Sequence, residues 1–170
     1  METRQPLKIA VLTISDSRTE ANDTSGDYLV AALQKAGHQL ANRSIIKDCK
    51  YTMRALVSNW ILDDHIEVII TSGGTGFTGR DSTPEALMPL FDKHIDGFGE
   101  LFRAISYTEI GSSTIQSRAF AGLANGTLVF ALPGSTHACE TGWEKILSTQ
   151  LNIDNRPCNF AELMPRFRET

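Results

Sequence analysis

Glycines dominate the segment that is richest in residues able to do chemistry. Residues 72–81 read SGGTGFTGRD and follow a short apolar run. Glycines let the backbone adopt positive φ and let a ligand approach closely, and successive amide N–H groups can form a nest for an anion. Both familiar nucleotide motifs fail here, because no helix opens directly after the turn and Arg80 and Asp81 replace the required Lys and Ser or Thr. A plain glycine-rich turn is the alternative, but the four glycines, two threonines and Arg-Asp pair favour an anion site.

Two aspartates are candidates for holding a divalent cation beside such an anion. Mg²⁺ is usually bound by one or two carboxylates together with substrate phosphates. Asp81 ends the glycine-rich segment, and an interaction with the dipole of a helix beginning at Pro84 explains it equally well. Asp48 follows an apolar pair, and the residues alone favour a role as N-cap of the next helix.

Two other turns offer hydroxyl groups. Ser25 and Gly26 lie near the start of an expected helix, where Thr24 and Asp27 also fit a capping pattern. Ser135 follows a Pro-Gly turn, which is consistent either with a phosphate contact or with helix capping. The four histidines are scattered without metal-ligand spacing, so we expect no zinc site.

Apolar strands that alternate with helices position these turns. The expected strands are residues 9–14, 40–46, 68–71 and 127–132, with helical patterns between them and a helix at about 137–147. The segment 92–117 is mixed and suggests short helices. This alternation predicts a three-layer α/β/α fold with a mainly parallel sheet. Ligands bind beyond the carboxyl ends of such strands, so the loops after Ser15, Thr71 and Leu132 are expected to form the site.

Composition narrows the classes of function. The 170 residues suit a single domain, 1–170, and the net charge of −4 argues against general nucleic-acid binding. No apolar run is long enough to span a membrane. The first residues form no signal segment, so a cytoplasmic location is expected. The three cysteines form no paired motif and are expected to be reduced thiols.

Five segments, in this order and spacing, resemble the MoaB/Mog family of molybdenum-cofactor biosynthesis proteins, and look most like its bacterial MoaB-type members. They are IAVLTISDSR, DTSGDYL, TSGGTGFTGRDSTPEAL, GFGELFR and ALPGSTHA. The resemblance covers about residues 8–160. It implies the same three-layer fold, and it implies that the chain binds molybdopterin.

The resemblance also implies a reaction and a set of site residues. Active relatives use Mg-ATP to adenylylate the terminal phosphate of molybdopterin. The residues that match their nucleotide turn are Gly73, Gly74, Thr75 and Gly76. Their two important aspartates match Asp48 and Asp81, which would hold Mg²⁺, so the resemblance replaces the capping interpretation of Asp48. Weaker candidates for binding the pterin substrate are Ser25, Gly26 and Ser135.

Two other functions and the assembly state remain as alternatives or expectations. The chain is alternatively a non-catalytic molybdopterin-binding or carrier paralogue, or a regulatory or scaffolding subunit. Family members form trimers, and MoaB-type members hexamers, so a homo-oligomer is expected. Apolar residues around segment 92–117 supply either contacts between copies or ordinary core packing; they are Phe91, Phe98, Leu101, Phe102 and Ile105.

Overall fold

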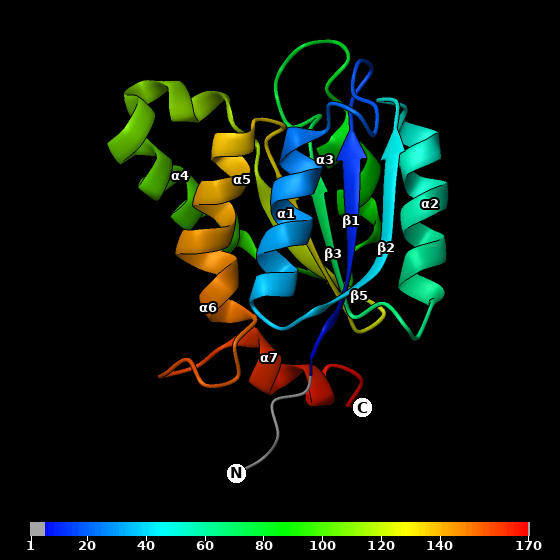
Figure 1. Ribbon diagram of the computed structural model, residues 1–170, viewed down its shortest axis with the longest axis vertical. Helices are drawn as coiled ribbons and strands as arrows, with labels where there is room; N and C mark the ends of the chain where they lie inside the picture. The colour runs from blue at the N-terminus through cyan, green and yellow to red at the C-terminus, as the bar shows by residue number, and fades with distance from the viewer. Residues whose placement is uncertain (1–5, 170) are drawn as a thin grey trace.

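Six strands form one sheet in the order β2-β1-β3-β6-β5-β4 (Figure 1). The structure is a computed structural model that describes residues 6–169. The strands are β1 (Lys8–Ile14), β2 (Gln39–Ile46), β3 (Val68–Ser72), β4 (Lys93–His94), β5 (Phe120–Ala124) and β6 (Thr127–Leu132). The first four in spatial order are parallel neighbours, whereas β5 pairs antiparallel with both β6 and β4. The predicted mainly parallel sheet is confirmed.

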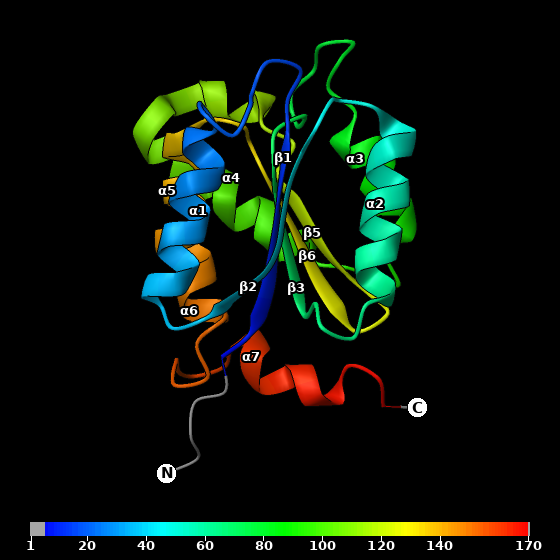
Figure 2. The same cartoon turned by 45° about the vertical axis from the view of Figure 1, so that its right-hand side comes forward.

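Helices cover both faces of this sheet, as Figure 2 shows. On one face lie α1, α4, α5 and α6, and on the other lie α2 and α3. The helices are α1 (Thr24–Lys35), α2 (Lys50–Leu62), α3 (Thr83–Leu87), α4 (Asp96–Ile110), α5 (Thr136–Gly142), α6 (Ser148–Gln150) and α7 (Phe160–Leu163). Short turns of other helix types are η1 (Met88–Leu90), η2 (Gly111–Gln116), η3 (Trp143–Leu147) and η4 (Met164–Arg166). The predicted three-layer α/β/α fold is therefore confirmed.

The central strands are buried on both faces, which explains their unbroken apolar runs. Side chains of β1 alternate between two hydrophobic clusters: Ile9 and Val11 belong to one, and Leu12 and Ile14 to the other. Because successive strand residues point to opposite faces, one strand holds both helical layers against the sheet. The sheet is thus a rigid base for the loops at its carboxyl edge.

Two strands were missed by the sequence analysis, the two-residue β4 and the longer β5. β5 precedes β6 and is joined to it by Asn125 and Gly126, whose φ angles are +49° and +80°. Positive φ at both central residues is the requirement of a tight two-residue hairpin turn, for which Asn-Gly is the favoured pair. The Asn-Gly dipeptide before β6 was therefore the available signal for an antiparallel partner.

The expectation of short helices in segment 92–117 was also wrong. A single 15-residue helix, α4, runs from Asp96 to Ile110 and is followed by η2. Phe98 and Phe102 on this helix are buried in the core, as the packing alternative predicted, whereas Leu101 is 48% exposed. None of the helices within residues 6–169 is long and apolar enough to cross a membrane.

Candidate functional site

Three loops meet at one point beyond the sheet, because β1, β3 and β6 are adjacent and parallel. Gly73, the first residue after β3, donates its N–H to the carbonyl of Leu132 at 3.0 Å. Its φ is +103°, and a Cβ there would lie 2.1 Å from the carbonyl oxygen of Ile14. Only glycine suits this position. The predicted convergence of the loops after β1, β3 and β6 is therefore present.

The glycine turn at residues 73–76 has its backbone carbonyls committed to the protein body. Thr83 donates to the first two carbonyls, from Oγ1 at 2.9 Å and from its backbone N–H at 3.0 Å. Arg118 donates to the other two, from its backbone N–H at 3.0 Å and from Nε at 2.9 Å. These four bonds fix the orientation of the peptide groups in the turn.

The amides of the same turn are not equally engaged. That of Gly73 is used by β6, and that of Gly76 is directed at the Asp81 carboxylate. Within residues 6–169, the N–H groups of Gly74 and Thr75 have no hydrogen-bond acceptor. Backbone N–H groups that lack water need a partner, and the Thr75 residue is only 3% exposed. The turn therefore has two adjacent N–H donors available for an anion. Of the four residues predicted to bind nucleotide, only Gly74 and Thr75 have such an amide.

Asp48 lies against this turn, although it is far from it in sequence. Its Oδ1 accepts the hydroxyl of Ser82 at 2.6 Å, and a Cβ on Gly74 would lie 2.8 Å from its Oδ2. Burial raises the pKa of Asp48, and the negative charge of Asp81 raises it further. The N-cap of α2 is Cys49, so the capping interpretation of Asp48 was wrong.

Asp81 flanks the other end of the turn. Its Oδ2 accepts from the backbone N–H and the hydroxyl of Thr78, at 2.8 and 2.7 Å, and a Cβ on Gly76 would lie 2.8 Å from the same oxygen. Partial burial opposes its ionisation, but the bonds from Thr78 and Gly76 outweigh burial and lower the pKa of Asp81. It is therefore ionised at neutral pH.

The helix that begins near Pro84, beside the turn, is short. α3 spans five residues and begins at Thr83, one residue before the expected start, with Ser82 as its N-cap. Thr83 points into the core and binds the glycine turn. Because a macrodipole grows from aligned peptide units, five residues contribute little, and the charge of the site is set by side chains and loop amides.

The two carboxylates have the character of a magnesium site. Among residues 6–169, no group of three or more His, Cys, Asp or Glu side chains could hold a metal by itself. Mg²⁺ commonly takes one or two carboxylates and completes its coordination with water and substrate phosphates. The repulsion between Asp48 and Asp81 that raises the pKa of Asp48 is what a bound cation would relieve. The residues therefore fit Mg²⁺ together with a phosphate ligand.

A cavity of about 420 Å³ opens beside the turn. Its wall includes Gly74, Thr75, Gly76, Asp81 and Ser135, and also residues of α4, η2 and α5. The hydroxyl of Ser135 accepts from the N–H of Ala138 at 3.1 Å and so caps α5. This volume is within the usual range for small-ligand sites.

Four predicted site residues do not line this cavity. Gly73 is one of them, because its N–H and its carbonyl are both bonded to the protein body. Asp48 contacts the turn at Gly74 but is not part of the cavity wall. Ser25 and Gly26 are buried at the start of α1, where the hydroxyl of Ser25 and the N–H of Gly26 donate to Asp23 at 3.4 and 3.0 Å. Their role in binding the pterin stays a prediction, and in the structure they belong to the junction of α1 with the sheet.

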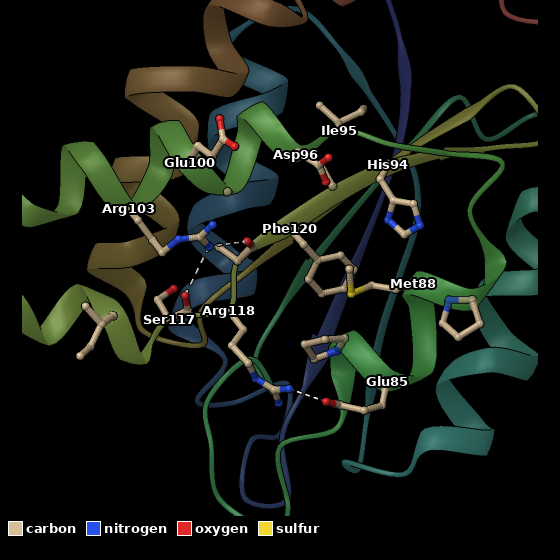
Figure 3. Close-up of a pocket in the computed structure, with 16 residues that line it drawn as sticks. Glu85, Met88, His94, Ile95, Asp96, Glu100, Arg103, Ser117, Arg118 and Phe120 are labelled. Atoms are coloured by element: carbon tan, nitrogen blue, oxygen red, sulfur yellow. Dashed lines mark hydrogen bonds and ion pairs between the residues drawn. The ribbon is translucent and has the colours of Figure 1, made fainter.

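A larger cavity of about 730 Å³ lies on the other side of segment 117–119. Figure 3 shows its labelled side chains, among them Arg118, which forms an ion pair with Glu85. The guanidinium of Arg118 also donates to the carbonyl of Asp81 at 3.3 Å. The larger cavity is lined neither by the glycine turn nor by Asp48 or Asp81. The smaller cavity is lined by the turn and by Asp81, so we place the site there.

Arg118 was not singled out by the sequence analysis, although it holds the glycine turn. Nothing in its sequence surroundings marks it, because its partners lie more than 30 residues away. Ser117 beside it was also missed; its Oγ is buried and has no hydrogen-bond partner among the described residues, and it lines both cavities. The bonds of Arg118 and the buried position of Ser117 both depend on the packing of the segment before β5 against the turn.

Comparison with known proteins agrees with this fold. The family described as "Probable molybdopterin binding domain" matches residues 10–152. The chain is 54% identical over 155 residues to molybdenum cofactor biosynthesis protein B of Escherichia coli K12, covering 91% of each chain.

Solved structures give the same result. A crystal structure of a molybdenum cofactor biosynthesis protein B superposes with a TM-score of 0.85 at 42% identity, over 88% of this chain and 94% of that one. The tungsten cofactor synthesizing protein MoaB of Pyrococcus furiosus superposes with a TM-score of 0.75 at 38% identity, over 85% and 92%. The chain therefore belongs to the MoaB/Mog family of molybdopterin-binding proteins.

Proposed function

We propose that this protein acts in molybdenum-cofactor biosynthesis by transferring AMP from Mg-ATP to the terminal phosphate of molybdopterin. The observation that carries the proposal is the glycine turn, in which the carbonyls are bonded to the protein while the N–H groups of Gly74 and Thr75 have no acceptor within residues 6–169. Two such donors, flanked by two carboxylates that suit Mg²⁺, form a site for a nucleotide phosphate chain.

The reaction is an in-line displacement at phosphorus. An oxygen of the pterin phosphate attacks the α-phosphorus of ATP, the new P–O bond joins AMP to the pterin phosphate, and the bond to pyrophosphate breaks. Such transfers depend mainly on positioning and on neutralising charge. Mg²⁺ held by Asp48 and Asp81 would supply that charge neutralisation. The amides of Gly74 and Thr75 would hold a phosphate group, and no side chain acts as a nucleophile.

The decisive experiment is formation of adenylylated molybdopterin per enzyme in a single turnover with Mg-ATP. Asp81→Asn keeps the size of the side chain but removes a ligand charge that a hard cation requires. Loss of several kcal/mol of charge stabilisation corresponds to a rate lower by roughly a hundredfold or more. Asp63→Asn, at an exposed carboxylate after α2, is the control, and thermal melting reports folding.

Each alternative has its own result. If the wild-type protein binds molybdopterin but forms no product where an active relative does, the chain is a non-catalytic binding or carrier protein. If it binds neither ligand, it is a regulatory or scaffolding subunit. If Asp81→Asn is as active as wild type, adenylyl transfer stands and the assignment of the magnesium ligand falls.

We also propose that the protein is a cytoplasmic homo-oligomer, a trimer or a hexamer. The surface that supports this is apolar and belongs to α4 and η2; its exposed members are Leu101, Tyr107, Ile110 and Ile115. Exposed apolar residues gathered on one element are typical of contact surfaces. Light scattering at micromolar concentration should give a mass of three or six chains, and a monomer would refute the proposal.

A further inference from the structure

The cavity continues from the glycine turn to a carboxylate that no part of the proposed reaction uses. Glu109 lies near the end of α4 and lines the cavity. The hydroxyl of Thr141 donates to its Oε2 at 3.0 Å, and Nε2 of His137 lies 3.1 Å from the same oxygen. These two residues of α5 fix the position of the Glu109 carboxylate, whose side chain is 29% exposed.

The Glu109 carboxylate keeps acceptor capacity toward the cavity. A carboxylate has about four acceptor sites, and the two contacts made within residues 6–169 both go to Oε2. A planar pair of N–H donors is the natural complement to the remaining sites. Phe102 and Ile110 from the same helix line the cavity beside Glu109 and offer apolar surface to the faces of a ring.

We infer that Glu109 binds the 2-amino-4-oxopyrimidine edge of the pterin. This edge has an amino group and a ring N–H side by side, so both donors face a carboxylate at once. Adenine places a ring acceptor beside its amino group and offers the carboxylate only one donor. The cavity end at Glu109 therefore selects the pterin over the adenine of ATP.

The distance between Ser135 and Thr141 along α5 allows one ligand to reach from the glycine turn to Glu109. Ser135 caps the helix next to the glycine turn, and Thr141 lies six residues later, about 9 Å along a helix at ~1.5 Å per residue. A pterin whose phosphate lies near Ser135 would thus reach Glu109 with its pyrimidine edge. This inference rests on the proposed function for the identity of the ligand, but not on catalysis.

The test is a fluorescence titration with 6-hydroxymethylpterin, which carries no phosphate, and with 6-hydroxymethyllumazine, in which an oxygen replaces the 2-amino group. Wild type should bind the pterin at least tenfold more tightly than the lumazine. Glu109→Gln should lose at least tenfold in pterin affinity and most of this preference, because its amide meets the amino group with a donor. Glu140→Gln is the matched control: Glu140 lies on α5, 3.6 Å from the other ring nitrogen of His137, and does not line the cavity.

Several results would overturn the inference. Failure of wild type to bind either compound would refute it. Equal weakening of both compounds in Glu109→Gln, with the preference kept, would make Glu109 a structural residue. Guanosine shares the same edge, and its binding as tightly as the pterin would assign the site to a guanine base. ATP is absent from this titration, so it is independent of the adenylyl-transfer assay. If Glu109→Gln loses the preference for the pterin but wild type forms no adenylylated product, the proposed reaction alone is refuted. If wild type forms the product but Glu109→Gln keeps the preference, this inference alone is refuted.

Discussion

The buried carboxylate of Asp23 should be one of the main determinants of stability at the base of the candidate site. The side chain is fully buried and joins three elements: it accepts from Thr13 of β1 at 2.9 Å, from the N–H of Gly26 in α1 at 3.0 Å, and from Arg43 of β2 at 2.9 Å. Asp23→Asn keeps one acceptor oxygen but turns an amide donor toward the other partners.

The cost follows from these contacts. A hydrogen bond to a charged group contributes about 1.5–3 kcal/mol, and breaking a buried ion pair costs about 3–5 kcal/mol. Arg43 retains Asp27 at 2.7 Å and is partly exposed, so we expect the lower end, about 3 kcal/mol. At ~2–4 °C per kcal/mol for a chain of this size, the melting temperature should fall by about 6–12 °C.

The dependence on pH gives an independent check. Burial alone would raise the pKa of Asp23, but the bonds from Arg43, Gly26 and Thr13 outweigh burial and lower it. A lowered pKa in the folded state means that the stabilisation is complete above the unfolded value of about 3.9 and disappears as the pH falls through the folded value. The difference between wild type and Asp23→Asn should therefore be constant at neutral pH and shrink below about pH 4.

Asp27→Asn is the control, because Asp27 contacts the same arginine from an exposed position. An exposed ion pair contributes less than about 1 kcal/mol. Urea unfolding at pH 7 and pH 3 measures both variants. Equal losses in the two variants, or a loss in Asp23→Asn that is the same at both pH values, would refute this account of the junction.

Three further predictions concern the glycine turn and the thiols. Gly73→Ala should lower the free energy of unfolding by at least about 2 kcal/mol, because its Cβ would overlap a backbone carbonyl at positive φ; Gly79→Ala, in open space, should leave thermal melting unchanged. Arg118→Lys replaces two separate guanidinium nitrogens, which bond the carbonyls of Gly76 and Asp81, with a single ammonium. The loss of one bond, about 1 kcal/mol, should speed amide hydrogen exchange in residues 75–82 by about fivefold; unchanged exchange would contradict a clamping role. Burial raises the pKa of Cys139 to about 12, so a thiol reagent at pH 8 should modify the two exposed cysteines of the native protein and all three only after unfolding.

Local patterns in the sequence were sufficient for the parts of the fold with one strong signal. The central strands are unbroken runs of apolar residues, and the glycine-rich segment 72–81 ends in an aspartate, so both were recognised. β5 was missed because FAGLA contains small residues and no alternation. α4 was misjudged because Gly97 and Gly99 interrupt the start of its helical pattern.

The candidate site was predictable only where its residues are close in sequence. The position of Asp48 against the turn depends on Ser82, 34 residues later, and that of Glu109 on Thr141, 32 residues later. Such pairs arise from the packing of helices against different strands, and neither residue has a distinctive local pattern. A capping role was a reasonable interpretation of Asp48 from local sequence. The family resemblance replaced it, and the packing of α2 and α3 shows which groups Asp48 contacts instead.

The strand order also has a consequence for aggregation. The sheet ends at β2 and β4, and exposed edge strands can pair with other chains into continuous cross-β stacks. β4 contains only two residues, both exposed and one of them a lysine. β2 is longer, but it carries a guanidinium and other polar side chains, and its register with β1 shifts between Ile9 and Ala10. Both edges are thus poor templates for a growing fibril, so copies of this chain that associate are expected to meet through helices and loops.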